Sequence, residues 1–173
     1  MEMSQLRRIT LVSGILLAGF GIDQVTKQFA ISSLRGKMPL AYFWNFFRFE
    51  YAENQGAFLS LGAGLSEGAR FWLLTFGVAV FLVLFLFYIV IDQKLGFADL
   101  ICYALVISGG ASNLFDRAFR PQGRVIDFMN VGIGNLRTGI FNVADVYITT
   151  GILLLMGRYF YQEFYLRRNN EIK

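Results

Sequence analysis

Two aspartates with similar short contexts are the residues of this sequence best suited to chemistry. Asp127 lies in the run Val-Ile-Asp-Phe and Asp145 in the run Asn-Val-Ala-Asp, within a polar stretch over residues 108–145 of an otherwise apolar chain. Two carboxylates held close together share one proton, because ionising both is costly. The charged carboxylate can then take a proton from water while the neutral one donates to a carbonyl oxygen, as in aspartic proteases. We interpret Asp127 and Asp145 as a candidate catalytic pair at a membrane surface.

The separation of 18 residues (145 − 127) leaves other interpretations open. Asp127 could cap a short interfacial helix. Asp116 and Arg117 could form only an ion pair at a helix end, and Asn113 could serve only backbone groups, as could Asn142. The chain has no histidine, which excludes Ser-His and Cys-His triads and the usual zinc sites. No motif points to a cofactor or to a metal.

The composition is that of a membrane protein. Of the 173 residues, 55% are hydrophobic and 17% aromatic, which a soluble domain with a polar surface rarely reaches. The length predicts a single domain over residues 1–173. The net charge of +4 fits contact with anionic lipid better than nucleic-acid binding, since no basic stripe interleaved with aromatics is present. The only cysteine, Cys102, lies in an apolar run and is expected to be a small buried side chain.

Four apolar segments predict an all-α membrane fold with four transmembrane helices over about residues 9–31, 70–91, 98–116 and 141–161. The segment 71–91 has no charge and is long enough to cross about 30 Å of hydrocarbon at about 1.5 Å per residue. The basic start and apolar run of the first segment also fit a signal peptide. However, helical character continues to about Ile31 and no large soluble domain follows, so a first transmembrane helix is the better interpretation.

A small extramembrane β-sheet is expected on the connection between the first two spans. Residues 47–52 alternate between aromatic and charged side chains, which is typical of a half-buried strand. The turn signal at residues 54–56 precedes a second short extended piece over 57–60. Tyr42, Phe43 and Trp44 are expected at the membrane interface.

Four spans place the unusual polar residues on one side of the membrane, whichever way the chain is inserted. Asp23 and Lys27, at the end of the first span, are four residues apart and can pair on one helix face. Polar groups near hydrocarbon are costly, so their convergence indicates a functional site. Basic residues nearly balance across the two sides, and Arg7 and Arg8 slightly favour an inside N-terminus. The other residues on this side are Asn54, Asn113, Asp116, Arg117, Asp127, Asn142 and Asp145.

Five short motifs follow one another along nearly the whole chain. They are Asp23-Gln24-x-x-Lys27, Asn54-x-Gly56-Ala57-Phe58, Asn113-Leu114-x-Asp116-Arg117, Val125-Ile126-Asp127-Phe128 and Phe141-Asn142-x-Ala144-Asp145. In this order and spacing they resemble the motifs of lipoprotein signal peptidase, also called signal peptidase II. The resemblance implies a bacterial inner-membrane aspartic endopeptidase that cuts prolipoproteins just before a diacylglyceryl-modified cysteine. It also implies cytoplasmic termini and an active site at the periplasmic or outer face.

The resemblance assigns roles to single positions. Asp127 and Asp145 match the catalytic pair, which would activate water without a metal or a covalent intermediate. Ser112 stands where the family usually has glycine, which suggests slightly looser helix packing. The substrate-binding or supporting positions are Asp23, Lys27, Asn54, Gly56, Asn113, Asp116, Arg117, Asn142 and Ala144.

The expected partners are the modified prolipoprotein and membrane lipid, with no nucleic acid, and the expected state is a monomer. Substrate is expected to enter sideways from lipid while residues 32–68 clamp it from above. Because Asp145 opens the fourth span and lies nearer the hydrocarbon, we expect it to be the initial acid.

Two other classes of protein stay open. A transporter using the aspartates as a relay predicts polar residues through the full depth of the spans, and the second span, which contains no charge, disfavours it. A membrane scaffold predicts tolerance of Asp127→Asn and Asp145→Asn.

Overall fold

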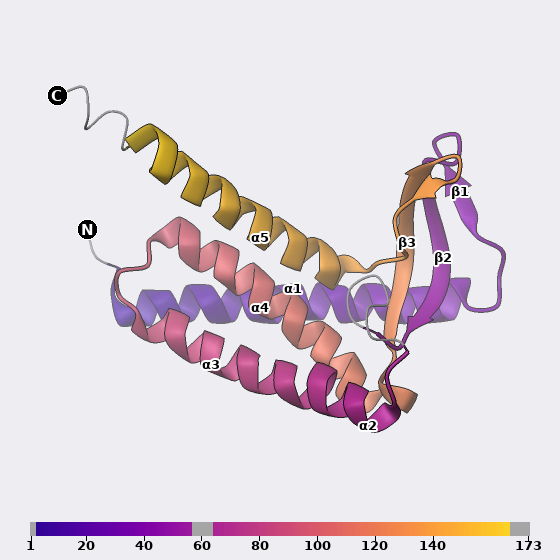
Figure 1. Ribbon diagram of the computed structural model, residues 1–173, viewed down its shortest axis with the longest axis horizontal. Coiled ribbons are helices and arrows are strands. Elements are labelled where there is room, and N and C mark those ends of the chain that lie inside the picture. Colours follow the sequence, from indigo (N-terminus) through magenta and orange to yellow (C-terminus); the bar gives the residue numbers. More distant parts are fainter. Residues whose placement is uncertain (1–2, 57–63, 167–173) are drawn as a thin grey trace.

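The computed structural model describes residues 3–56 and 64–166, which form a helical bundle with a small sheet at one end (Figure 1). Four of its helices are long and apolar enough to cross a membrane. The first is α1 (Gln5–Leu34). The second combines α2 (Glu67–Arg70), a π-helical segment η2 (Phe71–Gly77) and α3 (Val78–Ile91). The third is α4 (Phe97–Phe119). The fourth is α5 (Val143–Tyr161) with its continuation η4 (Gln162–Leu166). The prediction of four transmembrane helices is therefore confirmed.

Helix α4 is central to the bundle, with α1 on one side and α3 and α5 diverging from it (Figure 1). Small residues of α4 allow this close packing, as the sequence predicted. A Cβ added at Gly109 would lie 2.3 Å from the carbonyl oxygen of Ala144, the second residue of α5. A Cβ added at Gly19 of α1 would lie 2.3 Å from Oγ of Ser108. Both contacts are shorter than a side chain permits, so the glycines set the spacing between these helices.

The sheet has four antiparallel strands in the order β1 (Leu40–Tyr42), β2 (Phe47–Asn54), β3 (Val125–Ile133) and β4 (Leu136–Arg137). It lies at the end of the bundle opposite to the start of α1 (Figure 1). The predicted strand over 47–52 is confirmed, and its partners are β1 and β3. The predicted extended piece over 57–60 lies outside the described residues. A short 3₁₀ turn, η3 (Pro121–Gly123), joins α4 to β3. Strand β3 was missed, because residues 116–140 read as a polar connection.

The β1–β2 hairpin displays the aromatic residues expected at the interface. Phe43, Trp44 and Asn45 at its tip all have positive φ, at 51°, 50° and 69°, and Trp44 is fully exposed. Such angles are rare for residues with side chains. Arg137 holds the tip by donating from Nη1 to the carbonyl oxygen of Asn45 at 2.7 Å. The strained tip therefore presents its aromatic rings outward, away from the rest of the sheet.

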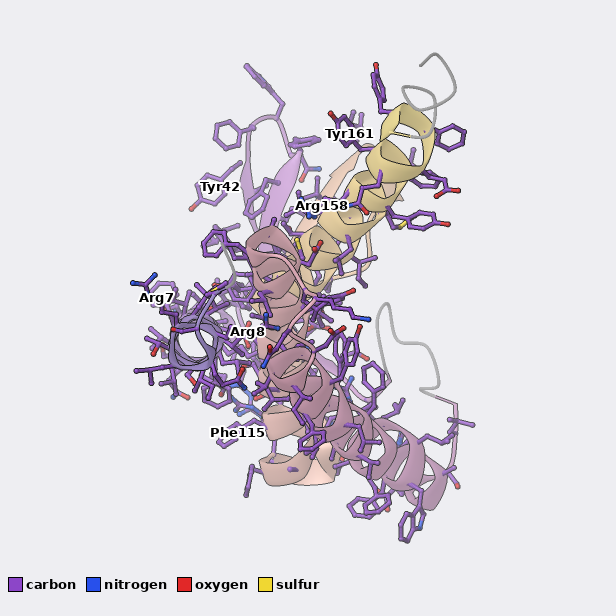
Figure 2. The ribbon with its side chains drawn as sticks, turned by 90° about the vertical axis from the view of Figure 1, so that its left-hand side faces the viewer. Arg7, Arg8, Tyr42, Phe115, Arg158 and Tyr161 are labelled. Atoms are coloured by element: carbon purple, nitrogen blue, oxygen red, sulfur yellow. The ribbon has the colours of Figure 1, made fainter. Side chains whose placement is uncertain are left out.

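At the end of the bundle opposite to the sheet, Arg8 is buried and donates hydrogen bonds to backbone carbonyl oxygens. Arg8 points into the bundle whereas its neighbour Arg7 points away from it (Figure 2). Arg8 Nη2 donates to the carbonyl oxygens of Ile89, at 3.0 Å, and Asp92, and its Nη1 donates to that of Leu95 at 3.2 Å. It thereby satisfies carbonyl groups at the C-terminus of α3, where a positive charge is also favourable.

We expect Arg8→Ala to destabilise the protein by about 2–3 kcal/mol, because several charge-assisted hydrogen bonds are lost and the carbonyl groups stay buried. Thermal unfolding in detergent measures the change. Arg7→Ala is the matched control, since Arg7 is exposed, and it should unfold at the wild-type temperature. Equal effects of the two variants would contradict the capping role of Arg8.

Candidate active site

The two candidate aspartates approach each other because β3 pairs with Phe141, two residues before the start of α5. Asp127 is the third residue of β3, and Asp145 is in the first turn of α5. Met129 forms an isolated antiparallel bridge with Phe141, in which their backbone N–H groups and carbonyl oxygens exchange hydrogen bonds of 2.8 Å. The chain folds back at this bridge, so the strand bearing Asp127 lies against the helix start bearing Asp145.

Asn142 connects the two carboxylates directly. Its Nδ2 donates to Oδ1 of Asp127 at 2.7 Å, while its backbone N–H donates to Oδ2 of Asp145 at 3.2 Å. Its Oδ1 accepts from the backbone N–H of Asp145 at 3.0 Å, which completes a capping box at the start of α5. The alternative that Asn142 serves only backbone groups is therefore wrong, since one side chain caps the helix and also bonds a candidate catalytic carboxylate.

Asn113 of α4 binds the second carboxylate, and Lys27 fixes its orientation. Asn113 Nδ2 donates to Oδ1 of Asp145 at 2.9 Å, and Asn113 Oδ1 accepts from Nζ of Lys27 at 2.8 Å and from Nδ2 of Asn142 at 3.1 Å. An ammonium group has only donors, so the amide oxygen must face Lys27 and the amide NH₂ must face Asp145. A residue on α1 thus sets which hydrogen-bonding group the candidate site presents.

Lys27 is fully buried, and acceptors surround it. Its Nζ lies 2.7 Å from Oδ2 of Asp23 and 2.8 Å from Oδ2 of Asp116, in addition to the bond to Asn113. All three charged side chains are 0% exposed. Three donors meet three acceptors, so this buried charge is fully satisfied. The predicted Asp23–Lys27 pair is confirmed, and it extends to a third charge on another helix.

The two carboxylates of this cluster position the chain segments that carry the site. Asp23 Oδ1 accepts from the backbone N–H of Ala144 at 2.8 Å, at the start of α5, where a negative charge is favourable. Asp116 Oδ2 accepts from the backbone N–H of Ile126 at 3.3 Å, one residue before Asp127. The alternative of an Asp116–Arg117 ion pair is wrong, because Asp116 pairs with Lys27 and, at 2.6 Å, with Arg120.

Ser112 strengthens this arrangement, which corrects the expectation of looser packing. Its Oγ donates to Oδ2 of Asp23 at 2.7 Å and accepts from Nε2 of Gln24 at 2.9 Å, and the residue is fully buried. The hydroxyl therefore adds two hydrogen bonds between α1 and α4. Sequence reasoning left out Ser112, Arg120 and Gln24 as site-supporting residues. For Gln24 a signal was present, because it lies in the motif Asp23-Gln24-x-x-Lys27.

Three further predicted positions extend the hydrogen-bond network beyond Asp127. Asn54 Nδ2 donates to Oδ2 of Asp127 at 3.0 Å, and its Oδ1 accepts from the backbone N–H of Gly56 at 2.9 Å. Arg117 Nη2 donates to the carbonyl oxygen of Gly56 at 2.7 Å. Asparagine donors therefore reach both oxygens of Asp127 and both oxygens of Asp145, and every predicted site residue belongs to one connected network.

A pocket of about 440 Å³ opens beside the carboxylates. Its polar part is formed by Asn54, Asn113 and Arg117 with the two aspartates. The rest of its lining is apolar apart from Thr149 and comes from η2, α3, α4, β3 and α5. This apolar part includes Leu74, Val78, Gly110, Val125, Ile148, Ile152 and Leu153.

Burial is greater at Asp127 than at Asp145, contrary to expectation. Asp127 is 2% exposed, whereas Asp145 is half-buried against the pocket. Burial, and next the nearby charge of Asp145, raise the pKa of Asp127 to about 7. The hydrogen bonds from Asn54 and Asn142 act in the opposite direction and are the weaker influence. Asp127 is therefore able to hold a proton near neutral pH.

A pair of neighbouring carboxylates at one end of a bundle of apolar helices, beside a largely apolar pocket, defines a candidate active site of a membrane protein. The family model of signal peptidase II matches residues 15–161 of the chain. The chain belongs to the signal peptidase II family, and it is a protease with four membrane-spanning helices.

Relatives agree with this assignment, and solved structures agree with the fold. A lipoprotein signal peptidase of Sphingopyxis alaskensis is 36% identical over 163 residues, covering 90% of this chain and 90% of the relative. One of Borreliella afzelii is 33% identical over 140 residues, covering 78% and 80%. A bacterial membrane enzyme solved in meso at 2.3 Å resolution has a TM-score of 0.77 at 22% identity, covering 90% of this chain and 91% of that one. A second, at 1.9 Å resolution, has a TM-score of 0.70.

Proposed function

We propose that the protein removes signal peptides from bacterial prolipoproteins, cutting just before the diacylglyceryl-modified cysteine by an aspartic mechanism. The observation that carries this proposal is the connection of Asp127 and Asp145 through one asparagine at the polar end of an apolar pocket. Lipoprotein signal peptidases similar over most of the chain supply the substrate class.

The two aspartates divide the chemistry between them. Asp145, the less buried carboxylate, takes a proton from a water molecule that attacks the scissile carbonyl carbon. Asp127 holds the shared proton and donates it to the carbonyl oxygen as the tetrahedral intermediate forms. The amide donors of Asn54, Asn113 and Asn142 keep the carboxylates in place. This mechanism reverses the initial expectation that Asp145 is the acid, because Asp127 is the more desolvated group.

The pocket fits a substrate that stays partly in lipid. Its apolar part is formed by side chains of η2, α3 and α5 and continues from the polar end toward the middle of the spans. A signal-peptide segment lies there by apolar contact, while Arg117 and the asparagines meet its polar backbone near the cut. Substrate reaches the pocket sideways from the bilayer, with its acyl chains remaining in lipid.

The protein is proposed to act as a monomer in the inner membrane, with the sheet and active site at the periplasmic or outer face and both termini in the cytoplasm. The end of α1, the start of α5 and strand β3, which carry polar residues of the site, lie at the sheet end of the bundle (Figure 1). This arrangement favours a surface-facing hydrolase over a relay through the membrane. Arg7 and Arg8 near the start of α1 favour a cytoplasmic N-terminus.

The raised pKa of Asp127 predicts a pH profile. If Asp127 must be protonated in order to donate, kcat falls as pH rises above about 7, approaching about tenfold per pH unit. Cleavage of a prolipoprotein in nanodiscs between pH 5 and pH 9 measures it. Asp99→Asn, at the opposite end of the bundle, should keep the same profile. A rate that rises through pH 7 would instead make Asp127 the base.

The function itself is tested by a gel shift. Purified protein in detergent is mixed with a diacylglyceryl-modified prolipoprotein and with the same precursor lacking the lipid. We expect a shift to the mature size for the modified precursor alone. No cleavage of it, under conditions where another signal peptidase II cuts, would contradict the proposal.

A further inference from the structure

A second polar cavity lies on the other side of β2 and β3 from the aspartate pair. It has a volume of about 500 Å³, and its lining includes Arg35, Arg120 and Arg124 together with Glu53. Arg35 directly follows α1, Arg120 directly follows α4, and Arg124 directly precedes β3. Three arginines from separate elements therefore converge on one space outside the candidate active site.

The length of α4 indicates that this cavity lies at the level of the lipid headgroups. Helix α4 has 23 residues, which corresponds to about 35 Å at about 1.5 Å per residue. The hydrocarbon layer is about 30 Å thick. Arg120, at the end of α4, therefore lies just beyond the hydrocarbon, where the phosphate groups of phospholipids are found.

The charges around the cavity do not balance. Glu53 is its one acidic lining residue among the described residues, and it is shared by Arg35 at 3.3 Å and Arg124 at 2.9 Å. Hydrogen bonds from Tyr51 and then Arg124 lower the pKa of Glu53, so it is ionised at neutral pH. Arg120 pairs with Asp116, whose charge is also shared with Lys27.

These ion pairs join four cations to three carboxylates, with Asp23 as the third acid. One positive charge is therefore in excess. The arrangement is more than a set of caps at helix C-termini, because Arg124 ends no α-helix and still faces the same space.

The arginines also keep donors available. A guanidinium group has five N–H donors. Within the described part of the chain, Arg120 uses only Nε, toward Asp116, and Arg35 uses only Nη2, toward Glu53. Nε of Arg124 is buried without a hydrogen-bond partner. A buried donor without a partner is unfavourable, so an acceptor at this position would stabilise the fold.

We propose that this cavity binds a singly charged phosphate group, as presented by the headgroup of an anionic phospholipid such as phosphatidylglycerol. The phosphate oxygens accept from Arg35, Arg120 and Arg124, and the single negative charge neutralises the excess positive charge. The cavity is also connected to the active site through β2, because Glu53 directly precedes Asn54, whose side chain donates a hydrogen bond to Asp127. The site is separate from the pocket assigned to the prolipoprotein.

The test measures lipid binding rather than cleavage. Protein in a neutral maltoside detergent is titrated with short-chain phosphatidylglycerol, short-chain phosphatidylcholine or inorganic phosphate, and bound ligand is followed by native mass spectrometry. We expect phosphatidylglycerol to bind wild type more tightly than phosphatidylcholine. The choline cation of phosphatidylcholine cancels its phosphate charge, so this lipid cannot neutralise the excess positive charge of the cavity. Arg35→Gln with Arg124→Gln should weaken phosphatidylglycerol binding about tenfold, equivalent to about 1.4 kcal/mol.

Two further variants separate the proposal from loss of folding. Arg35→Gln alone changes a side chain that is 63% exposed and should still weaken binding. Glu53→Gln removes the competing acid and should tighten binding, which damage to the fold would not do.

Arg7→Gln is the control variant. It makes the same change of charge as Arg35→Gln at the other end of the bundle and should bind as wild type. Inorganic phosphate binding that depends on the same arginines would support the anion site with a soluble ligand. Equal binding of both lipids, or binding unaffected by the double substitution, would overturn the proposal.

Discussion

Replacing Asp127 or Asp145 by asparagine is expected to reduce kcat by a factor of about 10³ to 10⁴, because each variant loses one of the two proton transfers. Asparagine has nearly the same shape as aspartate but can neither take up nor release the proton. Quantitative cleavage of the modified prolipoprotein, followed by gel shift over long times, measures the loss.

The folded state should survive these substitutions, and for Asp127→Asn the reason is specific. With a pKa of about 7, Asp127 is only partly ionised at neutral pH, so a neutral amide removes little stabilising charge. Thermal unfolding should therefore stay close to that of wild type. Asp99→Asn is the control, since Asp99 pairs with Arg158 at 2.7 Å far from the site, and it should cleave normally. Cleavage that persists in both site variants would refute the aspartic mechanism.

Replacing Lys27 by methionine is expected to give the largest loss of stability, about 3–5 kcal/mol. Methionine matches the side-chain length but leaves Asp23 and Asp116 buried without the cation that lies within 2.8 Å of both. Cleavage should also fall, because Asn113 loses the donor that fixes its amide. Thermal unfolding in detergent and the cleavage assay measure the two effects.

A double substitution shows whether the loss comes from uncompensated charge. Lys27→Met combined with Asp116→Asn removes one stranded carboxylate, so it should lose less stability than the sum of the two single variants. Lys94→Met, on the turn between α3 and α4, is the control and should unfold like wild type. Additive losses would mean that Lys27 and Asp116 do not interact in solution.

The sequence was sufficient to predict the helices and many of the polar residues that the structure brings together, because both are visible in the composition of single segments. Apolar segments of membrane-spanning length predict helices by composition alone. Polar residues near hydrocarbon are rare enough that Asp23, Lys27, Asn113 and Asp145 were identified by their position. The alternation of residues 47–52 similarly revealed the first six residues of β2.

The sequence could not show how these parts meet. Strand β3 is buried along most of its length, so it lacks the alternation that revealed β2. The degree of burial depends on the packing of several elements, which is why the sequence did not show that the protein buries Asp127 more than Asp145. The hydrogen bonds of Ser112 depend on the facing residues of α1, which are distant in sequence.

The pairing of Asp23 with Lys27 also has a consequence for how the protein is built into a bilayer. The two residues are one helical turn apart on α1, so they can neutralise each other while that helix is still alone in lipid. Helix α4 arrives later in the chain and brings Asp116 as a second partner for the same ammonium group. The first helix is thus inserted at reduced electrostatic cost, and the arrival of the third gives the bundle a polar contact that specifies its correct neighbour.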